Sequence, residues 1–366
     1  MKISVITVCY NSSATIERTI QSVIRQNYSD LEYIIIDGGS TDGTLDVIAK
    51  YQPYISLCIS EPDNGIYDAM NKGLERTTGD VVAFLNSDDW YERDVFEKVK
   101  NYFNGSNADM VSGNIYLHSS DGQNHKYVLD RENKENIFFQ VIYPQPALFV
   151  RKKFFEKTGG FDTSYRIAAD AAWLINACIA GAEVLCVDDY FTYFRDGGIS
   201  CQRKYEGYRE QYKAALMCAK TKGQEHLVKK IEDYYSNILE TIAREQKIWE
   251  AINNNTEEVK KLFYPQKSYY IWGAGMRGKA CLDMLTKLEI SIAGFIDQSP
   301  DKVRVENYPV ISMEEIDRTH CICITPKGYE KDIKELLIKS EMNADHVLVY
   351  SDLLEQIANI EELKNK

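Results

Sequence analysis

Two stretches near the start of the chain decide the fold: residues 3–11 read Ile-Ser-Val-Ile-Thr-Val-Cys-Tyr-Asn, and residues 33–44 read Tyr-Ile-Ile-Ile-Asp-Gly-Gly-Ser-Thr-Asp-Gly-Thr. Each begins as a short apolar run rich in β-branched residues, which is typical of a buried strand, and ends in a polar turn. Between them, apolar residues recur at helical spacing at Ile16, Ile20, Val23 and Ile24. A strand, a helix and a strand in close succession predict the start of an α/β sheet.

The same alternation continues to about residue 115. Residues 55–59 and 81–85 predict two more strands, and residues 66–74 predict a helix between them. Short connections between such units imply a parallel sheet that helices cover on both faces. In these sheets ligands bind beyond the carboxyl ends of the strands, so the polar residues that directly follow each strand are the candidates for a site.

Three parts are expected along the chain. Residues 1–202 form the first α/β domain, and residues 203–264 form a charged, tyrosine-rich helical segment. Residues 265–366 begin a new alternating unit, in which Gly273, Gly275 and Gly278 make a glycine turn between a strand and a helix. That context suits a dinucleotide fingerprint, with Asp297 after the next strand. The unit is too short for two nucleotide-binding halves, so a small Rossmann-like domain without cofactor chemistry is expected.

Composition narrows the classes of function. The 366 residues carry a formal net charge of −12 and a pI of about 5.1, which argues against nucleic acid as the main partner. Nine cysteines are scattered without metal-site spacing, as in proteins of a reducing compartment. The sequence shows neither a signal peptide nor an apolar run long enough to span a membrane. A cytoplasmic protein is expected, either free or peripheral at the inner face of the plasma membrane.

Two acidic residues follow the second predicted strand. Asp37 ends that strand, and Asp42 lies five residues later in a glycine-rich turn. A carboxylate in this place can accept a hydrogen bond from the edge of a nucleotide base, and the glycines allow a ligand to approach the backbone closely. The alternative is an ordinary turn in which Asp and Ser side chains cap the next helix.

A second polar cluster, Asn86-Ser87-Asp88-Asp89, follows the fourth predicted strand. Adjacent carboxylates at a strand end suit a hard divalent cation such as Mn²⁺ or Mg²⁺, which prefers oxygen ligands. Such a cation would bridge the phosphates of a nucleotide sugar and neutralise the leaving diphosphate. The alternative is a helix N-terminus with capping acids.

Four motifs together resemble family 2 glycosyltransferases of the GT-A fold. They are Ser-Val-Ile-Thr-Val-Cys-Tyr-Asn at 4–11, Ile-Asp-Gly-Gly-Ser-Thr-Asp-Gly-Thr at 36–44, Asp-Asn-Gly-Ile-Tyr-Asp-Ala-Met-Asn-Lys-Gly at 63–73 and Leu-Asn-Ser-Asp-Asp at 85–89. Their order and spacing agree with the family over residues 1–200. The resemblance implies a mixed sheet flanked by helices that binds a nucleotide sugar.

The resemblance also assigns roles to single residues. The nucleotide-sugar site it implies consists of Tyr10, Asn11, Asp37, Gly65, Asp68, Asn86, Ser87 and Asp88. Tyr10 would pack on the base and Asp37 would read it. Asn86 stands where the family carries the first acid of Asp-x-Asp, so metal binding would depend on Asp88, with Asp89 nearby.

The acceptor side of the family resembles residues 159–174 of this chain. An acid before an aromatic helix is the family's catalytic base, and that position falls on Asp170. An inverting transfer needs one carboxylate to take the proton of the acceptor hydroxyl. A helix-capping role for Asp170 is the alternative. Asp162 is a second candidate for the base, and Gln145 and Arg195 are candidates for acceptor and phosphate contacts.

These features predict a metal-dependent inverting glycosyltransferase that moves a sugar, with UDP as the expected carrier, to a glycan or lipid-linked acceptor in surface-polysaccharide biosynthesis. Expected partners are that donor and acceptor, a membrane surface and a second copy of the chain in a homodimer. A nicotinamide-dependent oxidoreductase acting on sugar nucleotides is one alternative, although no Tyr-x-x-x-Lys pair accompanies the glycine turn. A non-catalytic scaffold that binds nucleotide sugars is the other, although both Asp88 and Asp170 are present.

Overall fold

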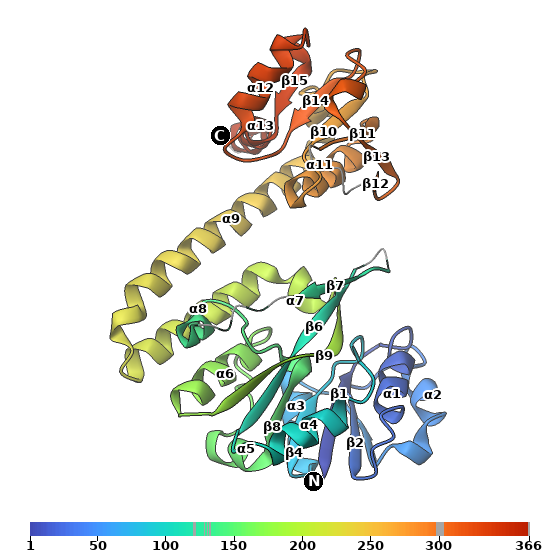
Figure 1. The fold of residues 1–366 in the computed structure, drawn as a ribbon, viewed down its shortest axis with the longest axis vertical. Helices are drawn as coiled ribbons and strands as arrows, with labels where there is room; N and C mark the ends of the chain where they lie inside the picture. Colours follow the sequence, from blue (N-terminus) through green and yellow to red (C-terminus); the bar gives the residue numbers. More distant parts are fainter. Residues whose placement is uncertain (120–121, 128, 130, 132, 298–303, 365–366) are drawn as a thin grey trace. The chain divides into compact units, whose positions relative to one another are not determined.

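The computed structural model describes residues 1–119, 122–127, 129, 131, 133–297 and 304–364. Its contacts divide the chain into two compact units, Met1–Leu239 and Glu240–Lys366 (Figure 1). This division falls inside the helical segment that was predicted as a separate part. The first half of that segment packs into the core of the first unit, and its last residues pack into the core of the second. The three-part division of the chain therefore remains a prediction.

A nine-stranded mixed sheet forms the centre of the first unit, with strand order β3-β2-β1-β4-β8-β6-β9-β5 and β7 paired to β6. Four of the strands lie where the sequence predicted them and are parallel to one another: β1 (Ile3–Cys9), β2 (Leu31–Asp37), β3 (Leu57–Ser60) and β4 (Val81–Phe84). The others are β5 (Trp90–Tyr91), β6 (Met110–His118), β7 (Asn124–Tyr127), β8 (Leu148–Arg151) and β9 (Val184–Arg195). Because β8 runs antiparallel to β4 and β6, the sheet is mixed.

Helices cover both faces of this sheet (Figure 1). Alternate residues of β1 point to opposite faces, so Ile6 and Val8 enter one core while Ile3 and Val5 enter the other. The helices of this unit are α1 (Ile16–Ile24), α2 (Thr44–Ala49), α3 (Ile66–Arg76), α4 (Val95–Asn104), α5 (Lys152–Thr158), α6 (Ala169–Ile179), α7 (Ile199–Gln202), α8 (Lys204–Thr221) and the first part of α9 (Val228–Asn254). Short 3₁₀ turns occur at Gln52–Tyr54, Lys134–Phe138, Gln145–Ala147 and Glu225–Leu227.

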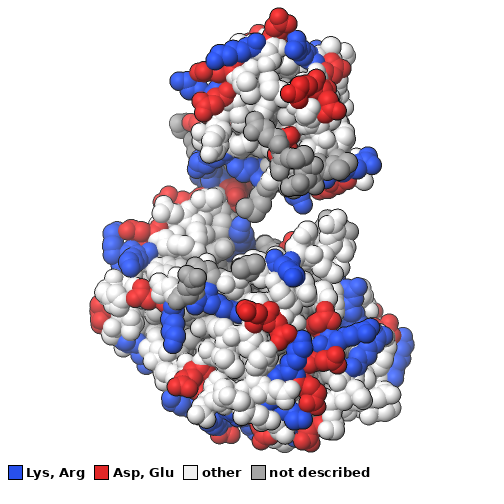
Figure 2. Space-filling view, in the orientation of Figure 1, with Lys and Arg blue, Asp and Glu red and all other residues white. Residues whose placement is uncertain are grey.

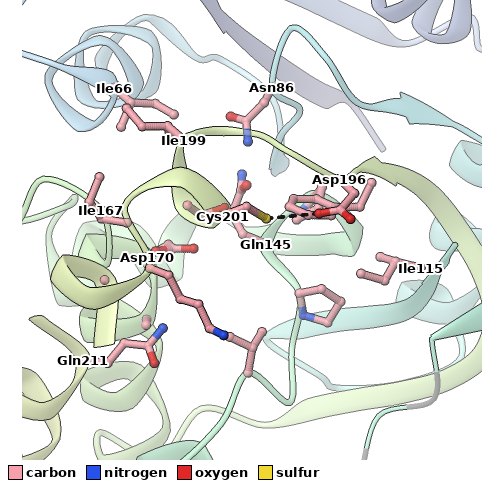
Figure 3. Close-up of a pocket in the computed structure, with 18 of the residues that line it drawn as sticks. Ile66, Asn86, Ile115, Gln145, Ile167, Asp170, Asp196, Ile199, Cys201 and Gln211 are labelled. Atoms are coloured by element: carbon pink, nitrogen blue, oxygen red, sulfur yellow. Dashed lines mark hydrogen bonds between the residues drawn. The ribbon is translucent and has the colours of Figure 1, made fainter. Parts of the chain in front are cut away.

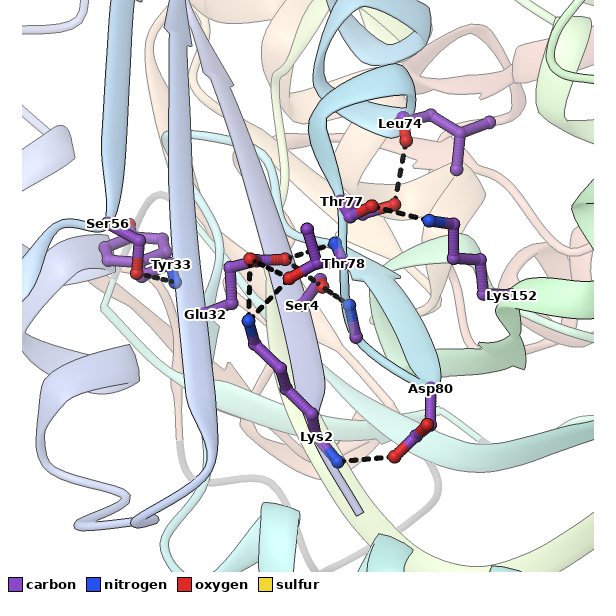
Figure 4. A network of polar contacts seen from close by, with 11 residues as sticks. Lys2, Ser4, Glu32, Tyr33, Ser56, Leu74, Thr77, Thr78, Asp80 and Lys152 are labelled. Atoms are coloured by element: carbon purple, nitrogen blue, oxygen red, sulfur yellow. Dashed lines mark hydrogen bonds and ion pairs between the residues drawn. The ribbon is translucent and has the colours of Figure 1, made fainter.

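A buried carboxylate joins the amino-terminal ends of β1, β2 and β4, at the edge opposite the expected site (Figure 4). Glu32 accepts hydrogen bonds from Ser4 Oγ at 2.5 Å, Thr78 N at 2.7 Å and Lys2 Nζ at 2.9 Å. Burial alone would raise the pKa of Glu32, but the hydrogen bonds from Ser4, Thr78 and Lys2 outweigh it and lower the pKa to about 2. The network therefore stabilises the edge of the sheet that lies opposite the expected ligand site.

The second unit holds a six-stranded sheet of order β12-β13-β11-β10-β14-β15, in which only β12 is antiparallel to its neighbour among the described strands. Its strands are β10 (Tyr269–Trp272), β11 (Ile292–Ile296), β12 (Arg304–Val305), β13 (Tyr308–Ile311), β14 (Cys321–Ile324) and β15 (Val347–Val349). Its helices are α10 (Thr256–Lys260), α11 (Met276–Lys287), α12 (Glu330–Lys339) and α13 (Tyr350–Lys364), with 3₁₀ turns at Met313–Glu315 and Ala344–His346.

The glycine turn of this unit connects β10 to α11 as the sequence predicted. Gly273 has a φ of +99°, which favours glycine, and a side-chain carbon at Gly278 would lie 1.9 Å from the Gly273 carbonyl oxygen. The Ala274 N–H donates to Asp297 Oδ2 at 2.9 Å, so the acid at the end of β11 holds the turn. The glycines thus allow the helix to pack directly against the strand.

Among the described residues, no helix combines the length and the apolar character that crossing a bilayer requires. Figure 2 shows acidic and basic side chains interspersed on the visible face of each unit. The net negative charge is therefore spread over this face and does not mark a site on it.

Candidate active site

A cavity of about 530 Å³ lies at the carboxyl ends of β1 and β4. It is lined by the end of β1 and the segment that follows it, the loop before α3 and the first turn of that helix, the segment after β4, and the end of β9 with the start of α7. The lining residues are Val8, Cys9, Tyr10, Asn11, Ser12, Ala14, Thr15, Asp63, Gly65, Ile66, Ala69, Asn86, Ser87, Asp88, Phe194, Arg195, Gly198, Ile199 and Ser200. The site therefore lies at the predicted edge of the sheet. We call this space the donor cavity, after the nucleotide-sugar donor that the sequence predicts at this edge.

Tyr10 and Asn11 form the wall that follows β1. Tyr10 is 64% exposed, so its ring is available to a flat ligand. Asn11 has a φ of +47°, and its Oδ1 accepts a hydrogen bond from Thr41 N at 3.0 Å while its own N–H donates to Ser40 Oγ at 2.8 Å. These bonds tie the loop after β1 to the loop after β2 and hold Tyr10 at the mouth of the donor cavity.

Asp37 does not line the donor cavity, although the sequence predicted that it reads the base. Its side chain has no exposed surface, and its oxygens accept hydrogen bonds from Gly39 N at 3.1 Å, Ser40 N at 3.0 Å, Ser40 Oγ at 2.5 Å and Ser60 Oγ at 2.6 Å. Burial favours the neutral acid, but the bonds from Ser40 and Ser60 outweigh it and lower the pKa of Asp37. In this arrangement Asp37 shapes the loop after β2.

Asp42 behaves as the alternative interpretation expected. Its carboxylate accepts hydrogen bonds from Ser13 N at 3.0 Å, Thr44 N at 3.1 Å and Thr44 Oγ1 at 2.5 Å. Asp42 therefore joins two loops and the start of α2, and it is not among the residues that line the donor cavity.

The segment before α3 contributes Asp63 and Gly65 to the cavity. Gly65 has a φ of +116°, and its N–H donates to Asp63 Oδ1 at 2.8 Å. Asp68, in the first turn of α3, accepts a hydrogen bond from Asn64 N at 3.0 Å and lies 3.6 Å from Lys72 Nζ. Asp68 is therefore engaged outside the donor cavity, whereas Asp63, which no sequence argument singled out, lines it.

Three of the four residues in the polar cluster after β4 line the donor cavity: Asn86, Ser87 and Asp88. The Oγ atom of Ser87 lies 2.8 Å from Ser12 Oγ. Burial raises the pKa of Asp88, and the nearby Arg195 opposes that rise. Asp89 is 1% exposed, and its Oδ1 accepts a hydrogen bond from Arg195 N at 3.0 Å, so Asp89 anchors the end of β9. Burial and the neighbouring Asp88 raise the pKa of Asp89 well above its usual range.

The cluster after β4 offers few oxygen ligands for a cation. Within the described residues, no group of three or more His, Cys, Asp and Glu side chains is placed to hold a metal. Asp88 supplies one carboxylate facing the cavity, and Asn86 Oδ1 is buried without a hydrogen-bond partner among the described residues. One carboxylate and one amide oxygen fit a hard cation that takes its remaining ligands from a diphosphate and water.

A second cavity has a volume of about 620 Å³ (Figure 3) and adjoins the first. The two share the residues Ile66, Asn86, Phe194, Ile199 and Ser200. Its wall is largely apolar and includes Ile115, Leu117, Tyr127, Val141, Ile167 and Tyr208. Arg166 and Lys204 add positive charge, and Asp170 and Asp196 add negative charge. We call this space the acceptor cavity, because it contains Asp170, which the sequence predicts to act on an acceptor.

Asp170 lies in the first turn of α6 and lines the acceptor cavity (Figure 3). Its Oδ1 accepts a hydrogen bond from the Tyr67 hydroxyl at 2.8 Å. Burial raises the pKa of Asp170, and the Tyr67 bond opposes that rise. The helix begins at Ala169, and its N-cap residue, Ala168, makes no side-chain cap hydrogen bond.

Glu210 of α8 fixes the backbone immediately before α6. Its carboxylate accepts hydrogen bonds from the backbone N–H groups of Arg166 at 2.8 Å, Ile167 at 2.8 Å and Ala168 at 3.0 Å. Neither Glu210 nor Tyr67 was singled out from the sequence, because each meets Asp170 or its segment from an element distant in the chain. The only local signal was that Tyr67 belongs to the motif at residues 63–73.

The remaining candidates from the sequence, Gln145, Arg195 and Asp162, line three different cavities. Gln145 is 9% exposed, lines the acceptor cavity, and its Nε2 has no partner among the described residues. Arg195 lines the donor cavity. Asp162 is exposed, accepts a hydrogen bond from Ser164 N at 2.9 Å and lines a separate cavity, so it is not placed with Asp170.

Two neighbouring cavities lie at the carboxyl edge of a mixed sheet, with Asp88 in one and Asp170 in the other, an arrangement that suits an enzyme with two substrates. The sequence profile described as "Glycosyl transferase family 2" matches residues 4–165. An uncharacterized glycosyltransferase of Mycobacterium tuberculosis is 31% identical over 211 residues, which cover 55% of this chain and 78% of that protein. The chain belongs to glycosyl transferase family 2.

Other comparisons agree on the class. A "PGL/p-HBAD biosynthesis glycosyltransferase" of Mycobacterium bovis is 33% identical over 173 residues, and the match spans 46% of this chain and 66% of that protein. Staphylococcus aureus TarS 1–349 in complex with UDP-GlcNAc has a TM-score of 0.55 at 18% identity, covering 71% of this chain and 81% of that one.

A mannosyltransferase from Pyrobaculum calidifontis in complex with GDP-Man and Mn²⁺ has a TM-score of 0.51 at 18% identity, covering 79% and 85%. These solved structures support the GT-A fold. A second profile, described as "C2185-like, N-terminal", matches residues 266–348.

Proposed function

We propose that this chain transfers a sugar from a nucleoside diphosphate sugar, with UDP as the carrier, to a hydroxyl group of an acceptor, with inversion at the anomeric carbon. The observation that carries the proposal is the shared wall of the two cavities. Asn86 lines both, and Asp170 lies in one while Asp88 lies in the other. A donor and an acceptor bound in the two cavities would therefore meet near Asn86.

Asp170 is the general base in this proposal. An acceptor hydroxyl loses its proton to the Asp170 carboxylate as its oxygen attacks the anomeric carbon, and the bond from that carbon to the diphosphate breaks. Burial keeps the carboxylate basic, while the Tyr67 hydroxyl holds its orientation. Glu210 fixes the backbone that leads into α6, so the base stays at the wall of the acceptor cavity.

Asp88 and Arg195 act on the other product. Both line the donor cavity, and Arg195 carries the positive charge that a departing diphosphate requires. Asp88 and Asn86 would hold Mn²⁺ or Mg²⁺, which supplies Lewis-acid stabilisation of the diphosphate when it is bound. Because the chain offers so few ligands there, phosphate oxygens and water would have to complete the coordination of such a cation.

The acceptor in this proposal has an apolar part and a negatively charged part. Ile115, Leu117 and Val141 line the acceptor cavity with apolar surface, whereas Arg166 and Lys204 suit a phosphate. A lipid-linked glycan precursor has both features. Such an acceptor would bring the protein to the cytoplasmic face of a membrane, in surface-polysaccharide biosynthesis, and we extend the proposal to that location and to a homodimer there.

We further propose that the second unit is Rossmann-like and does no redox chemistry. Its parallel strands follow the order β13-β11-β10-β14-β15, which matches the order of a dinucleotide-binding half with part of a second. A nicotinamide-dependent oxidoreductase would instead need NAD(P) binding at the turn beginning at Gly273 and hydride transfer to a sugar nucleotide.

A donor screen tests the proposal directly. The full chain is incubated with a panel of UDP-, GDP- and dTDP-sugars and Mn²⁺ or Mg²⁺, and release of the nucleoside diphosphate is measured with and without a polyprenyl-phosphate-linked glycan acceptor. We expect release from a UDP-sugar that is stimulated by the acceptor and abolished by EDTA. Binding of nucleotide sugars without any turnover would favour the scaffold alternative, and reduction of NAD(P) would favour the oxidoreductase.

A further inference from the structure

Asp37, the residue that the sequence predicts to read the nucleotide base, does not line the donor cavity. Asp37 has no exposed surface, and four hydrogen bonds from its own loop and from Ser60 occupy its oxygens. To reach a base, Asp37 would have to give up bonds that hold the loop after β2. Another acceptor must therefore meet the polar edge of a base stacked near Tyr10.

Asp63 lies where that acceptor is needed. A side-chain carbon placed on Gly38 would lie 2.5 Å from Asp63 Oδ2 and 3.4 Å from Tyr10 Cδ2. The Asp63 carboxylate therefore occupies the space beside Gly38 and close to the Tyr10 ring, although it comes from the loop after β3. Both Tyr10 and Asp63 line the donor cavity.

The two oxygens of Asp63 have different partners. Oδ1 accepts a hydrogen bond from Gly65 N at 2.8 Å, which fixes the orientation of the carboxylate. Among the described residues, Oδ2 has no hydrogen-bond partner and no cation paired with it. A fixed carboxylate thus presents one unoccupied acceptor oxygen next to an exposed aromatic ring.

We propose that Asp63 is the residue that selects the base of the donor nucleotide, by accepting the ring N–H of an imide base stacked on Tyr10. Uracil and thymine present one N–H between two carbonyl groups, so a single free oxygen satisfies their only edge donor. Cytosine has an unprotonated ring nitrogen at that position and meets the carboxylate with repulsion. Guanine presents two adjacent donors, of which one free oxygen satisfies only one.

Gly38 has a physical role in this proposal. Because Asp63 fills the space beside it, any side chain at position 38 would collide with the carboxylate. The acceptor for the base is therefore supplied by the loop after β3 and not by the loop after β2. The inference rests on the proposed function, since it concerns how the same donor cavity chooses its nucleotide.

Calorimetry on the full chain tests the inference, with UDP, dTDP, CDP, GDP and N3-methyl-UDP as ligands. We expect UDP and dTDP to bind more tightly than CDP, GDP and N3-methyl-UDP. Asp63→Asn keeps an oxygen for Gly65 N–H but replaces the free oxygen by a donor, so UDP affinity should fall about 10- to 100-fold, as for a lost charge-assisted hydrogen bond. The discrimination against CDP should fall with it.

Matched variants separate base recognition from general charge effects. Glu61→Gln removes a negative charge from the same loop outside the cavity, and UDP affinity should stay within about twofold. Gly38→Asp in an Asp63→Ala background restores a carboxylate to the same space and should bind UDP more tightly than Asp63→Ala alone.

Three results would overturn the inference. Asp63→Asn could bind UDP as the wild type does, the double variant could show no recovery, or Asp63→Asn could weaken GDP and CDP as much as UDP. A wild-type chain that binds none of these nucleotides would overturn the proposed function and this inference together.

Discussion

The Tyr67 hydroxyl offers a way to move the pKa of Asp170 without removing its carboxylate. Tyr67 is buried, and its hydroxyl lies 2.8 Å from Asp170 Oδ1 and 2.7 Å from the Ile167 carbonyl oxygen. One hydroxyl proton serves both acceptors, so the bond to the carboxylate is shared. Tyr67→Phe removes this donor and keeps the ring that packs against Phe161.

The size of the effect follows from the strength of that bond. A hydrogen bond to a charged group contributes about 1.5–3 kcal/mol, and one pKa unit corresponds to about 1.4 kcal/mol, which gives an upper limit of roughly 1–2 units. Because the proton is shared with Ile167, we expect a shift of about one unit. The bond lowers the pKa of Asp170, so its removal raises that pKa further.

The assay is the pH profile of kcat/KM, since a general base is active only when it is ionised. In Tyr67→Phe the acid limb should move to higher pH by about one unit. At pH values below the pKa of Asp170, kcat/KM should therefore be about tenfold lower than in the wild type. Asp170→Asn should lose about 10²–10⁴-fold in kcat and show no such limb, with UDP affinity nearly unchanged. An acid limb that stays in place in Tyr67→Phe, or an Asp170→Asn variant with more than about a tenth of the activity, would refute the assignment.

Removing Asp88 by Asp88→Ala should abolish the Mn²⁺-dependent part of transfer, and turnover that resists both this change and excess EDTA would contradict a metal role. Glu32→Gln should lower the free energy of unfolding at pH 7 by about 3 kcal/mol, since the folded pKa of about 2 lies below the ordinary value of 4.5. That difference should be fully present above about pH 5 and shrink as the pH falls toward 2, which urea unfolding at several pH values measures. Gly278→Ala should destabilise the second unit by about 1–3 kcal/mol, because its Cβ would meet the Gly273 carbonyl oxygen. Gly275→Ala is the control, since its Cβ would have open space, and hydrogen exchange of residues 266–348 distinguishes the two variants.

The strands and the turns of the first unit could be predicted because their signals are local. An apolar β-branched run followed by a polar turn predicted β1 and β2. The position of Asn86 and Asp88 directly after β4 predicted that they lie at the ligand edge of the sheet. These inferences need no knowledge of how distant segments meet. The GT-A class followed from the same local motifs taken in order.

What could not be predicted depends on partners distant in the chain. Asp37 is occupied partly because Ser60, 23 residues away, donates to it. Asp170 meets Tyr67 across 103 residues, and Glu210 reaches the segment before α6 from 42 residues or more beyond it. The boundary between the two units has no local signal either: α9 is one continuous helix whose two ends pack into different cores, so no break in the sequence pattern marks it.

Asn86 in place of an acid has a physical consequence for the residues beside it. Asp89 is already buried, and both its burial and the charge of Asp88 favour its neutral form. A third carboxylate at position 86 would add a like charge to this cluster and would favour protonation of Asp88, whose pKa burial already raises. Asparagine supplies an oxygen without that charge. It therefore adds no charge that would raise the pKa of Asp88 further, while it lines both the donor and the acceptor cavity.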